Sequence, residues 1–595
     1  SSGNSNTWST SSMGNSDVLL DSPTNNYPTI NAATPYNSTI TNLSQGNLHV
    51  KAVTYNNGYY GNHIATFKVP ESGKWYIETR MAVESGTGNT SWIGVMPQKT
   101  AIIPKDGSGA TDGEYFNNSA FTGMVADLIA TVDTIRLFDG GSAQETVTGA
   151  TATSYIIALA LDVDNNKVYG GYDSGSGITW LDSGNPAAGS NGQSHTFTSD
   201  TIIQLEVGPN SASNSNSKQT LNFGQNGTFC GLETAGGNAD GNGEGNFFYS
   251  PPSGFKALCS KNLPTPAIKK PTEHFNTVLY TGNGGTNAIT GVGHQPDLVW
   301  IKDRGGSTNH GLHDSVRANR AWISTNSNSA ESAGASYVSA FGSDGFTANA
   351  NTAGNANTEN YVAWCWKAGG SSSTNNDGAE ASTVSVNTTA GFSIIQGEGT
   401  GSSTTYGHGL GVVPKVYIVK LISDTGDWYL QTSALDGGWD YIQLNATGAS
   451  SSMTATAPTS SVIYSNATDG EDFLIYAFAE VEGFSKFGSY TGNGESENGP
   501  FVFTGFSPAL VIIKETSETG GSWFMWDNKR EVGNVKDAVI WADATNAETS
   551  HDEYEIDFLS NGFKIRGNSG GTNSNTETNF YMAFAEFPAK YANAR

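Results

Sequence analysis

Residues 505–514 read GFSPALVIIK, a Gly-x-x-Pro turn that leads into an apolar run ending in a lysine. The same pattern occurs at residues 293–302, GHQPDLVWIK, and at residues 411–420, GVVPKVYIVK. Each apolar run has the length and the β-branched content of a buried strand. A chain that repeats such a unit is an array of modules, and this decides how the rest of the sequence is interpreted.

Further marks recur around each copy. The segment YTGNG precedes the first turn at residues 280–284 and the third turn at residues 490–494. Each unit closes on an apolar run built around Ala-aromatic-small, and these runs lie at residues 363–365, 477–479 and 583–585. Proline cannot donate to a strand ladder, so the prolines of the three turns are expected to begin a strand: Pro296, Pro414 and Pro508. Each unit is therefore interpreted as one small β-sandwich of roughly a hundred residues.

The lysines that end the three runs are Lys302, Lys420 and Lys514. One interpretation makes them ligands for an anionic partner. The other makes them strand-end charges in solvent, and the general exposure of lysine favours this second interpretation.

Composition restricts the fold class and the partners. Only 14% of the residues are charged, 73 are glycine, and no long stretch shows the apolar period of a capped helix. The fold class is therefore expected to be all-β, as tandem β-sandwiches. The net charge of −26 argues against nucleic acid and against attraction to anionic lipid. No apolar run is long enough for a membrane helix, so no membrane insertion is expected.

Three cysteines are present, Cys230, Cys259 and Cys365. Their number and spacing match neither a disulfide framework nor a zinc site, and no cofactor or metal is expected. Cys365 lies in a closing apolar run and is expected to be a buried small hydrophobe. Cys230 and Cys259 flank a Gly-rich loop, where pairing is the less favoured alternative.

The first part of the chain carries three motifs in a fixed order. Residues 73–79 read GKWYIET, residues 156–169 read IIALALDVDNNKVY, and residues 221–227 read LNFGQNG. This region resembles the SPRY family, whose members are concanavalin A-like β-sandwiches that bind varied partners through variable loops. The resemblance implies an N-terminal SPRY-like jelly roll followed by three related β-sandwich modules.

The expected boundaries follow from these marks and from the polar stretches between them. They are an extended N-terminal segment with first strands at 1–55, a SPRY-like sandwich at 56–263, a linker at 264–272, repeat 1 at 273–370, a linker at 371–381, repeat 2 at 382–484 and repeat 3 at 485–595.

Two acidic stretches resemble calcium loops. Asp162, Asp164 and Asn166 imitate the first half of such a loop, but Lys167 stands where a glycine is needed, so a hairpin turn is favoured. Residues 236–246 could hold calcium through an aspartate and a glutamate, but a single copy favours a flexible loop.

No catalytic motif is found, and the chain is not expected to be an enzyme. The densest polar group contains His310, His313, Asp314 and Arg317. A metal could lie between the histidines and Asp314. The third repeat keeps only the Asp and the Arg of this group, so structural pairs Asp314–Arg317 and Asp527–Arg530 are favoured.

Aromatic faces next to short polar side chains suit sugar rings, which stack on apolar surfaces and hydrogen-bond through hydroxyls. The candidate exposed platforms for glycan are Trp428, Trp439 and Tyr441, and the pair Trp523 and Trp526. The alternative is that most of these side chains lie in the cores of small sandwiches.

Over nearly its whole length the chain also resembles structural proteins of marine bacteriophages, especially tail-fibre and virion-surface proteins. Besides the repeats, the resemblance includes residues 21–31, 43–48 and 251–258. It implies a virion protein, most simply a tail-fibre or receptor-binding subunit on the particle surface. The expected partners are copies of the same chain in a trimer, other virion proteins at the N-terminus, and a bacterial surface glycan or protein receptor. The alternatives are a capsid-decorating or head-fibre protein and a secreted carbohydrate-active enzyme with binding modules.

Overall fold

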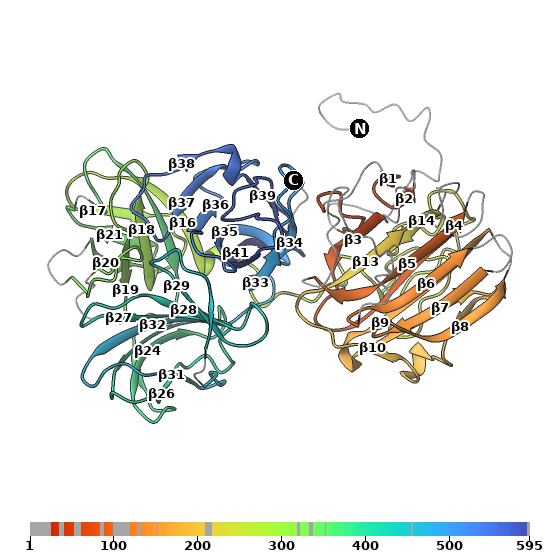
Figure 1. Ribbon diagram of the computed structural model, residues 1–595, viewed down its shortest axis with the longest axis horizontal. Coiled ribbons are helices and arrows are strands. Elements are labelled where there is room, and N and C mark those ends of the chain that lie inside the picture. The colour runs from red at the N-terminus through yellow and green to blue at the C-terminus, as the bar shows by residue number, and fades with distance from the viewer. Residues whose placement is uncertain are drawn as a thin grey trace. The chain divides into compact units, whose positions relative to one another are not determined.

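A computed structural model describes residues 25–34, 41–52, 61–83, 89–98, 119–128, 133–150, 153–208, 217–317, 322–332, 337–351, 353–453 and 456–591. The chain divides into two compact units, Ser1–Pro264 and Thr265–Arg595 (Figure 1). The described residues form strands, turns and short 3-10 segments, and none of them forms an α-helix. The expectation of an all-β fold is confirmed.

The first unit is a sandwich of two antiparallel sheets. One sheet has the order β1-β2-β14-β4-β9-β10-β11, with β12 beside β10 and β15 beside β4. Its strands are β1 (Thr41–Ser44), β2 (His49–Ala52), β4 (Lys74–Val83), β9 (Ser154–Asp162), β10 (Lys167–Asp173), β11 (Ile178–Trp180), β12 (Gln193–Ser194), β14 (Ser217–Asn222) and β15 (Lys256–Ala257). The strands β1 and β2 belong to this sheet, although the sequence placed them in a separate N-terminal segment.

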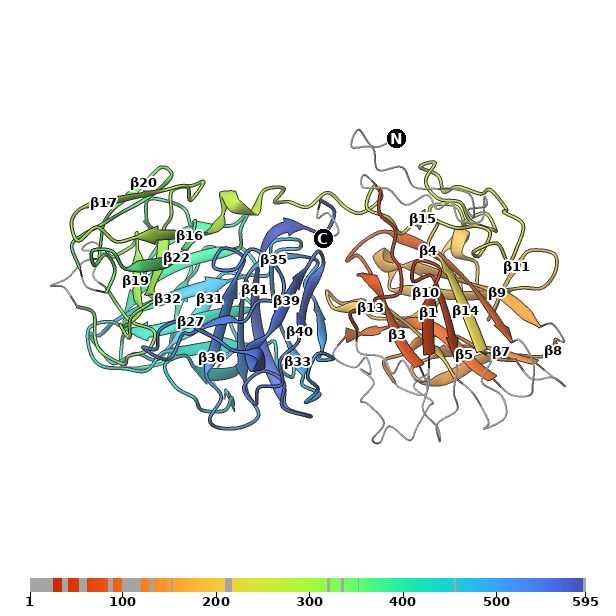
Figure 2. The same cartoon turned by 90° about the horizontal axis from the view of Figure 1, so that it is seen from above.

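The other sheet has the order β3-β13-β5-β6-β7-β8. Its strands are β3 (Gly61–Lys68), β5 (Asn89–Pro97), β6 (Thr122–Leu128), β7 (Asp133–Asp139), β8 (Ser142–Ala150) and β13 (Thr201–Val207). Alternate side chains of the two sheets meet in one core, as Ile77 and Leu159 do from the first sheet and Ile93 and Leu205 from the second. Figure 2 shows the two layers from above.

The three motifs of this unit lie on adjacent strands of one sheet, because β14, β4, β9 and β10 are consecutive neighbours. The acidic stretch between β9 and β10 is a tight turn, η4 (Val163–Asn165), that ends with Asn166 in the left-handed conformation. The Asp162 carboxylate accepts from the Asn165 backbone N–H and pairs with Lys74 at 2.7 Å. The favoured hairpin turn is therefore confirmed.

The second unit contains three large antiparallel sheets, one from each repeat. Repeat 1 gives the order β16-β22-β18-β19, repeat 2 gives β23-β24-β25-β32-β27-β28-β29-β30, and repeat 3 gives β33-β41-β35-β36-β37-β38. The strands of repeat 1 are β16 (Phe275–Thr281), β18 (Leu298–Asp303), β19 (Gly311–Asp314) and β22 (Asn360–Trp366). Those of repeat 2 are β23 (Ser373–Asn375), β24 (Ser382–Asn387), β25 (Phe392–Glu398), β27 (Val416–Leu421), β28 (Tyr429–Thr432), β29 (Asp440–Gln443), β30 (Ser451–Ser452) and β32 (Asp472–Phe478). Those of repeat 3 are β33 (Ser485–Thr491), β35 (Phe506–Glu515), β36 (Trp523–Asp527), β37 (Ala538–Trp541), β38 (Thr549–Ser550) and β41 (Thr578–Pro588).

A small sheet belongs to each large one. In repeat 1 it is β17-β21-β20, in repeat 2 β26-β31, and in repeat 3 β34-β40-β39. Their bounds are β17 (Asn287–Thr290), β20 (Val338–Gly342), β21 (Gly345–Ala348), β26 (Thr404–Gly407), β31 (Val462–Ser465), β34 (Phe501–Phe503), β39 (Ile556–Leu559) and β40 (Gly562–Ile565). The stretch 371–381, expected to be a linker, contributes β23 to the large sheet of repeat 2.

The register shows that the repeats are equivalent residue by residue. Leu298 pairs with Trp366, Val416 with Phe478, and Leu510 with Phe584, in each case between the strand after the proline turn and the closing strand. One face of each large sheet packs against the small sheet of its own repeat, which gives three separate outer cores.

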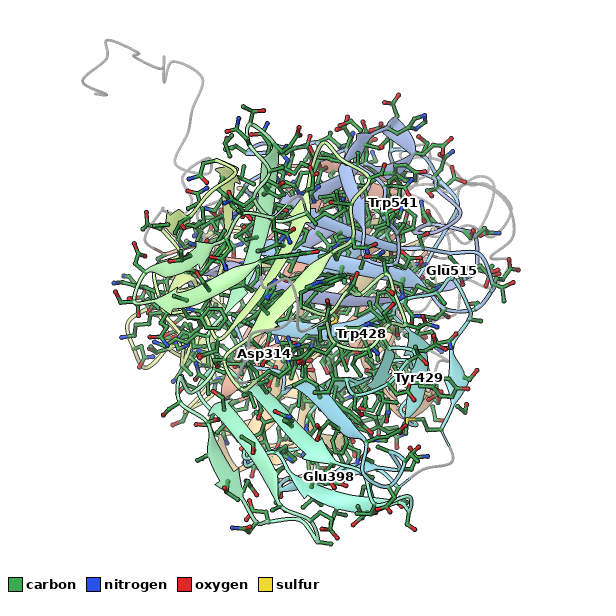
Figure 3. All side chains as sticks on the ribbon, turned by 90° about the vertical axis from the view of Figure 1, so that its left-hand side faces the viewer. Asp314, Glu398, Trp428, Tyr429, Glu515 and Trp541 are labelled. Carbon is green, nitrogen blue, oxygen red and sulfur yellow. The ribbon has the colours of Figure 1, made fainter. Side chains whose placement is uncertain are left out.

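The opposite faces of the three large sheets share one inner core, which contains Trp364 and Leu312 from repeat 1, Leu430 from repeat 2, and Ile512 and Met582 from repeat 3. Figure 3 looks onto this unit. Each repeat therefore forms a small sandwich, as expected, but the modules are not independent of one another, because one face of each large sheet lies in a common interior.

Candidate functional site

Aromatic side chains at one register position face the inner core in all three repeats. Trp523 stands opposite the lysine that ends the apolar run of repeat 3. His310 and Trp428 occupy the same position in repeats 1 and 2, since each directly precedes the strand that pairs with the apolar run of its repeat. All three are fully buried. Trp428 and Trp523, proposed from the sequence as exposed glycan platforms, are therefore structural core residues, and that prediction is wrong for both.

Each of these side chains donates to a main-chain carbonyl of a different repeat. His310 Nε2 lies 2.9 Å from the Trp541 carbonyl, Trp428 Nε1 2.8 Å from that of Ser324, and Trp523 Nε1 2.9 Å from that of Gln443. The three carbonyls also occupy equivalent positions. Each belongs to the residue that directly follows an isoleucine, and this isoleucine pairs with the middle of the strand that comes before it in the chain. Repeat 1 thus donates to repeat 3, repeat 2 to repeat 1, and repeat 3 to repeat 2, which closes a ring.

Trp526 was the remaining tryptophan of the second predicted pair. It lies in the outer core of repeat 3, and its Nε1 donates to the Tyr554 carbonyl at 3.0 Å. Its ring is stacked on Phe524. A tryptophan held in this way has no face free for a sugar, so this prediction is wrong as well.

The three lysines of the repeat are buried too. Each Nζ donates to the carbonyl of the next residue, at 2.7 Å for Lys302, 2.5 Å for Lys420 and 2.6 Å for Lys514. Burial lowers the pKa of each ammonium to about 8. The interpretation as strand-end charges in solvent is wrong: the ammonium satisfies carbonyls where the strand turns into a loop.

The Asp–Arg pairs are confirmed. Arg317 Nε donates to Asp314 at 2.7 Å, and Arg530 Nε to Asp527 at 2.6 Å. Each aspartate also accepts from another repeat, since Tyr476 Oη lies 2.9 Å from Asp314.

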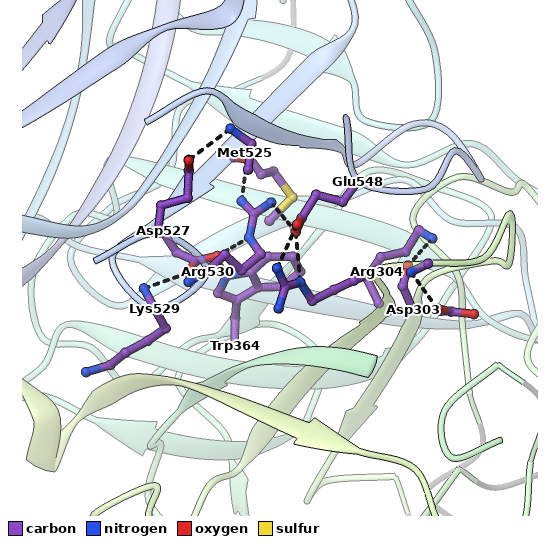
Figure 4. Close-up of polar contacts among 12 residues, drawn as sticks. Asp303, Arg304, Trp364, Met525, Asp527, Lys529, Arg530 and Glu548 are labelled. Atoms are coloured by element: carbon purple, nitrogen blue, oxygen red, sulfur yellow. Dashed lines mark hydrogen bonds and ion pairs between the residues drawn. The ribbon is translucent and has the colours of Figure 1, made fainter. Parts of the chain in front are cut away.

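Figure 4 shows the pair of repeat 3 with the contacts from repeat 1 around it. Trp364 Nε1 donates to Asp527 at 3.2 Å, and Arg304 and Arg530 both donate to Glu548. The pairs join neighbouring repeats to each other and leave no carboxylate free for catalysis at these positions.

The histidine cluster of repeat 1 does not form a metal site. His310 accepts from Trp300 Nε1 at 2.8 Å and donates to Trp541, while burial lowers its pKa to about 3. His313 packs against the Tyr337 ring. Among the residues that the structure describes, no group of three histidine, cysteine or acidic side chains has metal-binding geometry.

Two loop predictions of the first unit can also be placed. Asp240 is buried and accepts from the backbone of Asn242, Glu244 and Ala257, so its carboxylate holds the polar stretch 236–246 against the neighbouring segment. Cys230 and Cys259 both carry free thiols and do not pair, and Cys365 is free and buried as expected.

Glu78 is a buried carboxyl of the first unit whose pKa is raised. Burial raises the pKa of its carboxyl to about 7, although the group accepts from Tyr76, Asn222 and the backbone of Tyr249. These contacts fix a loop against the sheet and exclude solvent from the carboxyl, which is the geometry of a structural group.

Exposed aromatic rings remain on the outer face of repeat 2. Tyr429 on β28 is 36% exposed, and its ring centroid lies 5.6 Å from that of Tyr441 on β29 in an edge-on arrangement. Trp439, two residues before Tyr441, is half-buried on the same face and packs against Tyr417. Tyr441 and Trp439 were predicted from the sequence, whereas Tyr429 was missed. Figure 3 labels Tyr429 beside its buried neighbour Trp428.

The corresponding face is covered in the other two repeats. In repeat 1, Tyr337 stacks on Trp322 with centroids 5.3 Å apart. In repeat 3, Tyr554 packs on Phe524 at 5.4 Å and accepts from Trp526. Both tyrosines come just before the third strand of the small sheet, β20 or β39. In repeat 2 the described residues before β31 contain no such strand, and its small sheet has two strands.

Short polar groups surround the open rings. Asp427 accepts from Gln443 Nε2 at 3.0 Å and from Asn445 Nδ2 at 2.8 Å, which fixes all three side chains beside Tyr429. Gln431 follows Tyr429 by two residues on β28 and lies directly opposite Tyr441 on β29. We use "aromatic platform" for Tyr429, Gln431, Tyr441 and Gln443. It combines flat apolar rings with fixed donors and acceptors, which is what a sugar requires.

Comparison with known proteins gives one family match. The family model described as a domain of unknown function, DUF7483, matches residues 270–588, more than half of the chain. No curated protein matches the sequence.

Solved structures resemble parts of the chain at low identity. The SPRY domain of human HERC1 is 12% identical with a TM-score of 0.21, over 31% of this chain and 96% of that one. Peanut lectin with a nine-residue peptide is 10% identical with a TM-score of 0.23, over 33% and 92%. Lotus tetragonolobus seed lectin is 9% identical with a TM-score of 0.21, over 34% and 93%. These TM-scores are too low to support any statement about the fold. The sandwich fold of the first unit is established by its own strand order.

Proposed function

The chain belongs to the DUF7483 family, and we propose that it is a non-enzymatic virion surface protein that binds host surface glycans through the aromatic platform of repeat 2. The observation that carries the proposal is the pair Tyr429 and Tyr441, which repeat 2 leaves open where Tyr337 and Tyr554 cover the other repeats. A virion location is part of the proposal and is supported by the sequence resemblance to phage structural proteins.

The architecture supports a display role. Three modules built around one inner core make a rigid support, and a binding site on a rigid sheet needs little ordering when the ligand arrives. The acidic, Ser- and Asn-rich composition keeps such a particle protein soluble without a basic surface. Within this proposal the working assembly is a tail-fibre or receptor-binding trimer.

A glycan array with the purified chain tests the binding role. The Tyr429→Ala and Tyr441→Ala variants are each expected to lose about fivefold in affinity for the glycan that binds, since one stacked ring contributes on the order of 1 kcal/mol. Tyr429→Phe keeps the ring and is expected to bind like the parent chain. Leu279→Ser, which changes another exposed apolar residue, serves as a surface control.

The outcomes separate the alternatives. No bound glycan, together with antibody labelling of the capsid, would favour a capsid-decorating role. Release of reducing sugar from a bound polysaccharide would favour the enzyme. Binding that survives both alanine substitutions would remove the aromatic platform as the site.

A further inference from the structure

A recess lies at one end of repeat 3, apart from the aromatic platform of repeat 2. It has a volume of about 580 Å³ and is bounded by the start of β35, the loop between β36 and β37, the β39–β40 turn and the end of β41. This volume is within the range of small-molecule sites, ~300–1,000 Å³. We call it the repeat 3 pocket.

The pocket depends on an insertion. Between two equivalent register positions, the sequence runs from Asp527 to Val539 in repeat 3, but only from Thr432 to Tyr441 in repeat 2 and from Asp314 to Trp322 in repeat 1. These positions match in register, so repeat 3 has gained about three residues here. The added residues form one wall of the pocket.

The inserted loop is fixed at both ends. Asp527 accepts from the backbone N–H groups of Lys529 and Arg530 at 2.9 Å. Asn534 exchanges two hydrogen bonds with the backbone of Phe558, at 2.8 and 2.9 Å. Lys536 Nζ donates to the Gly533 carbonyl at 3.1 Å and lies 5.1 Å from the centre of the Phe558 ring. The wall is therefore preorganised, which lowers the entropic cost of binding.

Three apolar side chains are exposed at the rim of the pocket. Val532 is 82% exposed, and Phe587 and Tyr591 are each 43% exposed. All three line the pocket. An exposed apolar rim around a concave site marks a ligand-binding surface.

The charged groups indicate the sign of the ligand. Lys529, Lys536 and Glu586 line the pocket, two ammonium groups to one carboxylate, in a chain whose net charge is −26. Lys529 forms no ion pair among the described residues, and its ammonium points away from the Asp527–Arg530 pair (Figure 4). A free ammonium at an apolar rim favours a carboxylate on the ligand.

We propose that the repeat 3 pocket binds an acidic sugar, with the Lys529 ammonium on the sugar carboxylate and Phe587 and Tyr591 against the ring. Glu586 lines the same pocket and is placed to accept from sugar hydroxyls. This site is separate from the aromatic platform and stands whether or not the platform binds glycan.

Titration calorimetry of the full chain with methyl glucuronide and methyl glucoside tests the proposal. The uronide is expected to bind about tenfold more tightly than the uncharged glucoside, and this difference is expected to shrink in high salt. Lys529→Ala is expected to abolish the difference and Lys529→Arg to keep it. Tyr591→Ala is expected to weaken both sugars. Lys269→Ala, an exposed lysine outside the pocket, is the control.

All of these side chains are at least partly exposed, so the variants are expected to keep the melting temperature of the parent chain. Equal affinity for the two sugars, no binding of either at millimolar concentration, or a Lys529→Ala variant that still prefers the uronide would each overturn the proposal. A structure with the bound uronide outside the repeat 3 pocket would overturn it as well.

Discussion

The outer faces of repeats 1 and 2 differ more than their inner faces do. In both repeats the inner face supplies a buried ring that donates to a neighbouring repeat, His310 in one and Trp428 in the other. On the outer face, Tyr337 covers repeat 1, while Tyr429 of repeat 2 is open to solvent. A repeated module can thus vary the face that points outward while the face that holds the ring of repeats stays constant.

The largest expected effect concerns the inner face. Trp428→Ala should cost about 3–5 kcal/mol of unfolding free energy, because it empties a large volume in a well-packed core. Since the inner core is shared, calorimetry should show the whole second unit melting earlier in one transition. Trp439→Ala, on the outer face of the same repeat, should cost less. Three separate transitions in the parent chain would contradict the shared core.

The buried ion pairs give the next test. Asp527→Ala removes the buried carboxylate closest to the Arg530 guanidinium and leaves it only the more exposed Glu548, so it is expected to cost about 3 kcal/mol. Repeat 2 has Thr432 at the same register position, with no pair, so Thr432→Val should cost about 1 kcal/mol or less. Denaturant unfolding of the two variants compares the positions directly. Equal losses would mean that the pair is not what stabilises this position.

The covering tyrosines sharpen the comparison of outer faces. Tyr337→Ala removes a buried ring from repeat 1 and should cost about 3 kcal/mol. Tyr429→Ala removes an open ring and should change stability by about 0.5 kcal/mol. Thermal melts of the two variants are sufficient. A large loss for Tyr429→Ala would show that its ring is structural and would weaken the glycan proposal.

The smallest effect is a pH dependence common to all repeats. The pKa of each buried lysine is about 8 in the folded chain, below the ordinary value. Between pH 8 and about 10 the unfolded chain therefore binds more protons than the folded chain, and stability should rise with pH. Below pH 8 both states are protonated and this contribution is constant.

Lys514→Met isolates this effect. The variant should show a smaller rise between pH 8 and 10 than the parent chain when urea midpoints are compared. Lys420→Met should behave in the same way, although it lies in the repeat with the open outer face. An unchanged rise in both variants would mean that other groups titrate.

Strand alternation explains what the sequence could and could not predict. The apolar runs after Pro296, Pro414 and Pro508 indicated the strands, and the Asp527–Arg530 spacing indicated the ion pair. The expectation that each proline begins a strand is wrong for Pro508, which lies inside β35 where the register shifts. The period of two also separates Trp428 from Tyr429, since adjacent residues of a strand point to opposite faces. Applied to β28, it would have indicated Tyr429 as the outward ring. It does not say which face is covered, because both faces of these sheets contact protein.

The lysines show a different limit. A charged side chain at the end of an apolar run is usually exposed to solvent. Lys302, Lys420 and Lys514 are buried instead, because each ammonium donates to a main-chain carbonyl. One acceptor is the next residue of the strand, but others, such as the Asn328 carbonyl beside Lys420, come from loops whose path no local pattern gives. The repeat 3 pocket was missed for the same reason. Its wall is a loop held by Asn534 and Lys536, and neither residue is among the marks that recur in the other repeats.

The ring of hydrogen bonds through His310, Trp428 and Trp523 also bears on biosynthesis. On the ribosome, repeat 1 emerges first, but its acceptor Trp541 and the strand β41 are among the last parts of this unit to be made. The inner apolar faces of the first two repeats must therefore wait, uncovered, until translation has passed residue 588. A nascent chain of this design depends on fast completion or on a chaperone. A premature stop codon in repeat 3 would release a product whose three repeats cannot complete the ring of hydrogen bonds.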